Sequence, residues 1–425
     1  MLNYPTVAMD QLQVGLYIVL ELNWFEHPFA LSHFKIKSDE QIKIIRTLGL
    51  PTVCYNPALS DIAPREDSSA PPAPPTPAAA KVDISPALAA KRAMIERIKT
   101  QREAAERIEQ AFISTAKTIR QIEKNLFSQP AETVREARQL VTQIADSILC
   151  APELAIHIMG DKMGGEELYF HALNVTMLSM MMARDIGLPP QVVDALGMGA
   201  LFHDVGSKDI PSRILTKLEP LTQAERNLLE MHCQYGVEHG RRLQFGAPIL
   251  AIIAEHHELF DGSGYPAKLK GESIGLLSRI VVIANYYDEL CNPVSLADAM
   301  TPHEALSLMF AKLRNKFDPK LLQVFIHCLG VYPPGTIVQL SNGMIGMIAT
   351  VNTAKPMMPM IVIYDANIPR QQAILLDLQH ETDVNIAKAI RPAQVSREIY
   401  NYLSPRKRVS YYFDAGKPGP GTGGA

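Results

Sequence analysis

Two adjacent histidines, His256 and His257, begin the stretch HHELFDGSGYP, which ends at Pro266. Neighbouring residues on a helix project about 100° apart, so two adjacent side chains rarely contact one partner. Two metal ions, each bound by its own imidazole, would explain the adjacency. A helix end, where one histidine packs and the other meets solvent, would explain it as well.

Three further histidines precede this pair, each in an apolar segment with a helical pattern. His171 lies in EELYFHALNV, His203 is followed by Asp204 in ALFHDVG, and His232 lies in LLEMHCQYG. A single such histidine would be a packed core residue or a helix cap. Five in series, with a His-Asp and a His-His dipeptide among them, favour a metal centre. Imidazole and carboxylate together suit Mn, Fe or Zn, because Mg and Ca sites consist mainly of oxygen ligands.

Two acidic residues could add to this set. Glu167 lies four residues before His171 in a helical stretch, so both side chains project from one face, although a surface glutamate would give the same spacing. Asp261 could be a ligand, a residue that orients one, or a turn residue. The sequence DGSG favours the turn.

The segments that must position these residues are predicted to be helical from about residue 154 to 331, with short loops. Beyond residue 335, alternating apolar residues in TIVQLSNGMIGMIATVN, MPMIVIYD and AILLDL predict a small β unit over 332–412. The tail AGKPGPGTGGA, within 413–425, is predicted to be disordered.

The N-terminal part divides into three predicted segments. Residues 1–60 form a small α/β unit, with strands in VGLYIVLEL, FKIKS and PTVCY and a helix in DEQIKIIRTLG. A Pro/Ala-rich linker follows over 61–85. Amphipathic connecting helices over 86–150 carry apolar residues at spacings of three, four and seven, broken at Gln129-Pro130, so they would pack or mediate a homodimer.

Composition excludes several classes of protein. The net charge of -3 over 425 residues gives no reason to expect a nucleic-acid polymer as partner. Five cysteines without a C-x-x-C spacing indicate a reducing cytosol, hence a cytoplasmic location. No apolar run reaches the ~18–20 residues of a membrane span.

Together these motifs resemble the HD-GYP subfamily of the HD-domain metallophosphohydrolases. The resemblance covers roughly residues 160–330 and is carried by His171, HDVG, HCQYG, HHE and DGSGYP; the unit before it is similar to a small domain of unknown function that often precedes HD-GYP domains. The resemblance implies a mainly α protein, with an all-helical HD-type domain over 151–331 beside the small α/β and β units. It also implies two or three Fe or Mn ions, or other divalent metals, and hydrolysis of cyclic di-GMP or a related cyclic dinucleotide to pGpG and GMP.

The resemblance also assigns roles to individual residues. His203 and Asp204 would be catalytic, His256 and His257 would bind different ions of one cluster, and GYP would form a wall beside the nucleotide. The implied metal ligands are Glu167, His171, His203, Asp204, His232, His256, His257 and Asn285. The implied substrate-binding residues are Ser207, Lys208, Asp261, Gly264, Tyr265 and Pro266.

Three positions depart from the family pattern. Asn285 stands where the family has a metal-binding aspartate, and Ser207 stands where it has a phosphate-binding lysine. The segment NPVSLADAM holds no basic residue where the family has an arginine-rich one. The resemblance therefore leaves three interpretations open: a phosphodiesterase, a degenerate module that binds metal, nucleotide or a signalling partner, such as a diguanylate cyclase, without efficient hydrolysis, and an HD phosphohydrolase that acts on another phosphoester.

Overall fold

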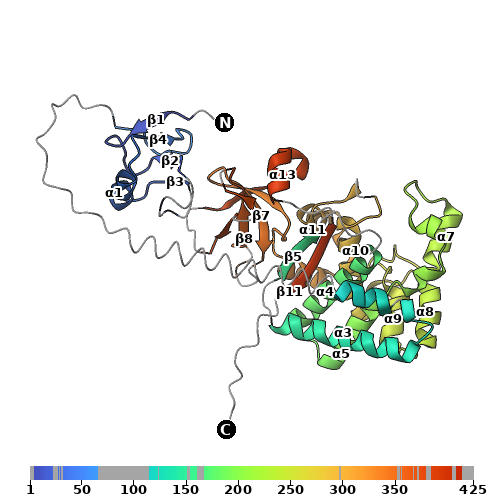
Figure 1. Cartoon of the computed structure of the whole chain (residues 1–425). Helices are drawn as coiled ribbons and strands as arrows, with labels where there is room; N and C mark the ends of the chain where they lie inside the picture. Colours follow the sequence, from blue (N-terminus) through green and yellow to red (C-terminus); the bar gives the residue numbers. More distant parts are fainter. Residues whose placement is uncertain are drawn as a thin grey trace, which may run out of the picture. The chain divides into compact units, whose positions relative to one another are not determined.

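The structure is a computed structural model of the 425-residue chain (Figure 1). It describes residues 4–22, 27, 29, 32–65, 114–122, 124–150, 154–159, 167–295, 298–351, 355, 357–366, 368–370, 373–379, 384–403 and 408–413. For 147–150, 154–159, 167–169 and 408–413 it describes the backbone only. Most of the predicted linker, the predicted helix before residue 114 and the tail after 413 lie outside this range.

The first of two compact units contains the N-terminal sheet. Its four antiparallel strands lie in the order β1 (Thr6–Ala8), β4 (Thr52–Tyr55), β2 (Tyr17–Val19) and β3 (His33–Lys35). The helix α1 (Asp39–Thr47) begins after Ser38, whose side chain accepts a hydrogen bond from the Gln41 backbone N–H. Ile42 and Ile45 of α1 are buried in the core of this unit. The predicted small α/β unit is thus confirmed.

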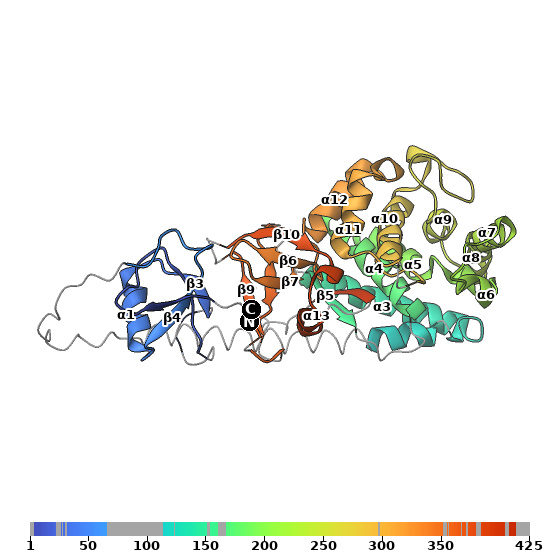
Figure 2. The same ribbon diagram turned by 90° about the horizontal axis from the view of Figure 1, so that it is seen from above.

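The second unit is mainly helical (Figure 2). Residues 114–122 are helical, and the helices whose bounds are described are α3 (Pro130–Cys150), α4 (Glu167–Ile186), α5 (Pro190–Phe202), α6 (Ser212–Leu215), α7 (Gln223–Glu230), α8 (His232–Arg242), α9 (Ala247–Glu255), α10 (Leu276–Cys291), α11 (Pro302–Ala311), α12 (Pro319–Leu329) and α13 (Arg397–Leu403). The helices α4, α5, α9 and α10 pack against one another around an apolar core that includes Leu178, Met181, Ile252, Ile280 and Tyr287. Apolar residues dominate these four helices because each is covered on most sides.

A seven-stranded antiparallel sheet corrects one expectation from the sequence. Residues 154–159 were expected to be helical, but they form the strand β5 (Leu154–Met159), which pairs with β11 (Arg408–Phe413) and β7. Figures 1 and 2 show β5 and β11 side by side. The other strands are β6 (Ile337–Leu340), β7 (Ile345–Thr350), β8 (Met360–Ile363), β9 (Ile374–Asp377) and β10 (Ile386–Ile390), which confirm the predicted C-terminal β unit. β5 was missed because its pairing partner lies at the far end of the chain.

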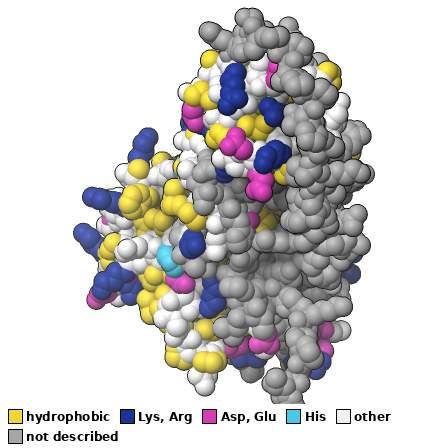
Figure 3. Space-filling model, turned by 90° about the vertical axis from the view of Figure 1, so that its left-hand side faces the viewer, with side chains coloured by type: hydrophobic (Ala, Val, Ile, Leu, Met, Phe, Trp, Pro, Cys, Tyr) yellow, Lys and Arg dark blue, Asp and Glu magenta, His cyan; other side chains and the backbone are white. Residues whose placement is uncertain are grey.

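No feature of the sequence indicated a nucleic-acid partner or a membrane span, and the surface charges and the helices bear on these two points. On the face shown in Figure 3, Lys and Arg side chains are interspersed with acidic and apolar ones among the described residues. None of the described helices is long and apolar enough to cross a membrane.

Candidate metal centre

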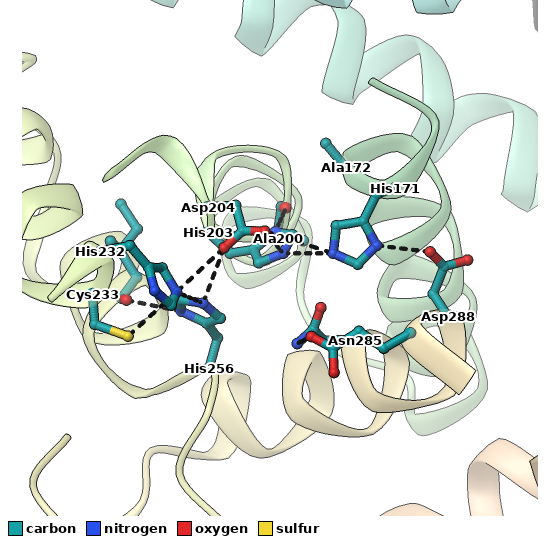
Figure 4. Close-up of polar contacts among 12 residues, drawn as sticks. His171, Ala172, Ala200, His203, Asp204, His232, Cys233, His256, Asn285 and Asp288 are labelled. Carbon is teal, nitrogen blue, oxygen red and sulfur yellow. Dashed lines mark hydrogen bonds and ion pairs between the residues drawn. The ribbon is translucent and has the colours of Figure 1, made fainter. Parts of the chain in front are cut away.

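The first half of the centre joins α4 to the end of α5. His171 on α4 and His203, which caps α5, lie with their Nε2 atoms 3.2 Å apart (Figure 4). The Nδ1–H of His203 donates to the Ala200 carbonyl over 2.7 Å, and the Nδ1–H of His171 donates to the Asp288 carboxylate over 2.7 Å. Each ring is therefore held by one nitrogen and presents the other.

The second half repeats this arrangement at α8 and α9. His232 is the first residue of α8, and His256 caps the C-terminus of α9; their Nε2 atoms are 3.0 Å apart. The Nδ1–H of His232 donates to the Leu229 carbonyl over 2.6 Å, and that of His256 to the Ile253 carbonyl over 2.9 Å. Since Nδ1 is the donor in every case, the Nε2 lone pairs face inward. Two facing lone pairs at these distances repel, and a proton or a bound cation relieves the repulsion.

Asp204 lies between the two halves and contacts both. Its Oδ2 atom lies 3.5 Å from His203 Nε2 and 3.8 Å from His171 Nε2. Its Oδ1 atom lies 3.3 Å from His232 Nε2 and 3.4 Å from His256 Nε2. One carboxylate thus belongs to both groups of histidine nitrogens, and it would supply an oxygen ligand to a metal ion held by either group.

His257 also joins the second group. A ligand atom of His257 lies within 4.8 Å of those of Asp204, His232 and His256. The helix α9 ends at Glu255, so the two adjacent histidines follow the helix rather than lie within it. The two explanations of their adjacency are therefore compatible: they form a helix end, and both belong to one group of possible metal ligands.

The GYP loop packs back on this histidine pair. The Tyr265 ring stacks on the His257 ring, with centroids 4.6 Å apart and planes 20° from parallel, and the Tyr265 N–H donates to the His257 carbonyl over 3.2 Å. A Cβ atom at Gly264 would lie 2.3 Å from the Leu259 nitrogen, so only glycine fits there. Pro266, the last residue of the motif, is exposed.

Glu258, the third residue of HHE, anchors this loop, a role that the sequence did not suggest. Its side chain is buried, and its two carboxylate oxygens accept hydrogen bonds from the backbone N–H groups of Ala267 (2.6 Å) and Leu269 (2.9 Å). Asp261 forms the turn: its Oδ1 atom accepts from the backbone and the hydroxyl of Ser263 over 2.9 and 2.6 Å. A contact of Asp261 with substrate stays a prediction.

The segment after Asp204 is the 3₁₀ helix η2 (Val205–Asp209). It lies so close to α8 that a Cβ atom at Gly206 would be 2.0 Å from the His232 carbonyl oxygen. This close approach sets Asp204 beside His232. Ser207 is half-buried and Lys208 is exposed, and their predicted contact with substrate stays a prediction.

The helix α10 contributes three polar residues to this region: Asn285, and Asp288 and Glu289 of the YYDEL segment that follows it. Asn285 is buried, and its Nδ2 donates to Glu289 Oε1 over 3.0 Å. Its Oδ1 is buried and has no hydrogen bond partner in the described part of the chain. Asp288 is fully buried and accepts from His171 and, over 2.8 Å each, from Asn174 and Asn292. Asp288 therefore orients a ligand and cannot itself be one.

Glu167 is the remaining predicted ligand. It begins α4, one turn before His171, but its side chain lies outside the described part of the chain.

The charge states of the described groups suit a metal centre. Burial lowers the pKa of His203 to about 3 and that of His257 well below its usual range, which keeps both imidazoles neutral. Burial raises the pKa of Asp204, but its electrostatic interaction with His203 and its hydrogen bond with His256 outweigh burial and hold the pKa well below the usual value. Burial lowers the pKa of His171, yet the hydrogen bond to Asp288 and its charge prevail and raise it to about 9.

The neutral imidazoles of His203 and His257, the ionised carboxylate of Asp204 and the Asn285 amide oxygen, which has no partner among the described residues, fit a divalent transition metal such as Mn, Fe or Zn. The Nε2 atoms of His171, His203, His232 and His256 would hold it together with Asp204.

Comparisons with known proteins identify three regions of the chain. Residues 123–321 match the HD domain, residues 5–137 a domain of unknown function (DUF3391), and residues 337–398 a KOW domain associated with the HD domain.

Among characterised relatives, the cyclic di-GMP phosphodiesterase PA4108 of Pseudomonas aeruginosa is 27% identical over 97% of this chain and 99% of its own length. The cyclic di-GMP phosphodiesterase response regulator RpfG of Xanthomonas campestris is 35% identical over 34% of this chain and 39% of its own length. The 3'3'-cGAMP-specific phosphodiesterase 2 of Vibrio cholerae is 34% identical over 37% of this chain and 30% of its own length. A solved structure of Bd1817, an HDG"Y"P protein from Bdellovibrio bacteriovorus, aligns with a TM-score of 0.41 and 15% identity over 76% of this chain and 98% of its own.

The chain is therefore an HD-domain protein with an N-terminal DUF3391 domain, and the relatives that it resembles are named as phosphodiesterases of cyclic di-GMP or 3'3'-cGAMP.

Proposed function

We propose that this centre hydrolyses cyclic di-GMP with two or more divalent ions, Fe or Mn. The observation that carries the proposal is the position of Asp204, whose two oxygens each approach a different pair of histidine Nε2 atoms. Relatives that share the HD domain are named for phosphodiesterase activity on cyclic di-GMP or 3'3'-cGAMP.

In the proposed reaction, water adds to one phosphorus atom and the P–O3′ bond breaks, with the proton of the water passing to the 3′ oxygen. The linear product is pGpG, and hydrolysis of its remaining phosphodiester gives two GMP. Bound divalent ions would supply Lewis acidity to the phosphate oxygens. The protein contributes fixed ligands: His203, with its pKa lowered to about 3, stays neutral at pH 7, and Asp288 fixes the ring of His171.

The GYP loop is proposed to line the nucleotide site. One face of the Tyr265 ring is stacked on His257, and Glu258 holds the backbone that follows Pro266. Because the loop contacts a ligand of the centre directly, a nucleotide whose phosphate reaches the ions would lie beside it.

The test is anaerobic loading with Fe(II) or Mn(II), incubation with cyclic di-GMP, and chromatography for pGpG and GMP. Wild-type protein should form both products, and His203→Ala should form neither. The same assay with 3'3'-cGAMP decides between the two dinucleotides for which the relatives are named. A fully loaded wild type that leaves both dinucleotides intact would refute the proposed hydrolysis.

A second candidate is a module that binds a cyclic dinucleotide, or a partner such as a diguanylate cyclase, with little turnover. Three departures from the family pattern favour this candidate. Asn285 lacks the negative charge of an aspartate that would bind metal, and Ser207 and the segment NPVSLADAM lack basic residues that would bind phosphate. Equilibrium dialysis that shows bound cyclic di-GMP, without product, would support this candidate. The cytoplasmic location and the homodimer remain predictions.

A further inference from the structure

On α10, Asn285 has an amide where the family pattern has a carboxylate. An acidic residue, Glu289, lies one turn further along the same helix. Asn285 and Glu289 are four residues apart on α10, so their side chains share one face of the helix. The Nδ2 of Asn285 donates to Glu289 Oε1 over 3.0 Å. This bond fixes the amide, so that its oxygen points away from Glu289.

Among the residues that the structure describes, none is a hydrogen bond partner of the Asn285 side-chain oxygen. Asn285 is 2% exposed, and its Oδ1 is buried without a hydrogen bond among the described residues. A buried polar atom of this kind costs about 1–3 kcal/mol unless another group satisfies it. In the view of Figure 4, the Asn285 side chain projects from α10 toward the side on which the histidine rings lie. A metal ion bound there would supply the missing interaction.

Glu289 lies within electrostatic reach of both halves of the centre. The charges of His171, Asp204 and His256 act on its carboxylate. Glu289 is also exposed to solvent, and the side chain of Asp204 is 39% exposed. In the part of the chain that the structure describes, Asn285 is its only hydrogen bond partner.

Asp288, the other acidic residue of YYDEL, has no oxygen available to bind a cation. Asp288 is fully buried, and three side chains, His171, Asn174 and Asn292, already donate to it. Glu289 is therefore the acidic residue of YYDEL with an oxygen available to a cation.

We propose that Asn285 and Glu289 act as a pair at the metal centre: the amide oxygen of Asn285 is a ligand, and the Glu289 carboxylate supplies the negative charge that an aspartate at 285 would otherwise give. The inference rests on the metal centre of the proposed function but not on hydrolysis of cyclic di-GMP. It predicts that either acid suffices, an aspartate at 285 or a glutamate at 289, and that losing both weakens the centre.

The test measures metal rather than product. Purified full-length protein is titrated with Mn(II), and free Mn(II) is followed by its electron paramagnetic resonance signal, which gives stoichiometry and affinity. Glu289→Gln should lose one equivalent of Mn(II) or bind it at least about tenfold more weakly. Adding Asn285→Asp to Glu289→Gln should restore wild-type binding, because the carboxylate returns one turn earlier.

Glu272→Gln is the matched control, since this exposed residue of η3 (Gly271–Ser273) undergoes the same loss of charge. Glu289→Gln that binds Mn(II) like wild type would overturn the inference, as would a double variant that is not rescued. Wild type that takes up no Mn(II) would overturn this inference and the proposed centre together. Wild type that binds Mn(II) but forms no pGpG would refute only the hydrolysis.

Discussion

At the scale of single residues, the centre depends on how each imidazole is held. His203, His232 and His256 each donate from Nδ1 to a backbone carbonyl three residues earlier, whereas His171 donates to a carboxylate. A carbonyl fixes orientation alone. A carboxylate also stabilises the protonated ring, which makes His171 the ligand whose charge depends on pH.

Metal binding should therefore depend on pH through His171. Its pKa is raised from 6.5 to about 9, so the metal-free protein holds a proton there at neutral pH that a metal must displace. Mn(II) affinity should rise with pH until about 9, with release of this proton. For the metal-free fold the sign is opposite: the His171–Asp288 interaction stabilises fully below about pH 6.5 and is lost as pH rises through about 9.

Asp288→Asn tests this assignment. The variant removes the charge that raises the pKa of His171, so burial should lower it and the rise of Mn(II) affinity between pH 7 and 9 should disappear. Affinity at pH 9 should fall by about 10–100-fold, because the ring loses its orienting partner. Asp298→Asn, at an exposed position after α10, serves as control. An unchanged pH profile in Asp288→Asn would show that another group titrates.

At the scale of elements, close backbone contacts bring ligands from distant segments together. Gly206 lets η2 approach α8, and Gly264 lets the GYP loop fold back on the histidine pair. At both glycines, the atoms that a Cβ would meet are backbone atoms and not metal-ligand atoms of the centre. Their part is to remove the Cβ atom that would separate the elements.

Gly206→Ala should therefore act on the metal as well as on stability. The added Cβ would lie 2.0 Å from the His232 carbonyl and 2.3 Å from the Gly236 nitrogen, both backbone atoms that cannot move alone. We expect a loss of about 1–3 kcal/mol in unfolding free energy, and less bound Mn(II), measured by urea titration and metal analysis. Gly246→Ala, whose Cβ would meet nothing closer than 3.8 Å, should retain its metal. Full metal content in Gly206→Ala would contradict the proposed positioning.

Glu258 offers a test of the loop without touching a ligand. Glu258→Ala leaves the N–H groups of Ala267 and Leu269 without their acceptor, at a cost of about 1–3 kcal/mol each if they stay buried. Hydrogen exchange over residues 259–270 should quicken and pGpG formation should fall, while metal content is kept. Glu272→Ala gives the comparison. Equal exchange in the two variants would show that Glu258 does not hold the loop.

The sequence was sufficient for the identity of the histidine series but not for its geometry. Residue types and the HDVG and HHE motifs suggested which side chains meet, because such motifs carry their own local structure. The roles of Glu258 and Glu289 were missed, since each depends on a partner brought near by the fold: backbone N–H groups beyond the loop for Glu258, and the centre itself for Glu289. β5 was missed for the same reason, as LAIHIM becomes a strand by pairing with RVSYYF.

At the scale of the whole molecule, the strand β11 joins the end of the described chain to the start of the helical domain. It pairs with β5 over six residues, from Arg408 opposite Met159 to Phe413 opposite Leu154, and it contacts α4. The helix that begins the metal centre is thus supported by a strand more than two hundred residues away.

Deletion of residues 404–425 should lower the melting temperature and loosen α4. Removing β11 leaves β5 without its partner on that side, so its backbone groups on that edge lose their hydrogen bonds. Thermal unfolding and hydrogen exchange over 167–175 measure the effect. Deletion of 414–425 alone keeps β11 and should behave as wild type. If both deletions melt alike, β11 does not support the domain.

The register of β5 and β11 also determines how this part of the molecule would respond to force. Leu154 follows α3 closely and pairs with Phe413, so a pull on α3 and on the C-terminal end of β11 acts on the same end of the strand pair. The load falls on one residue pair at a time, and the strands unzip rather than shear. Tension between these two points would therefore peel β11 from β5 at low force, beginning at Leu154 and ending at Met159. The strand pair would open before the helices that carry the histidine centre unfold.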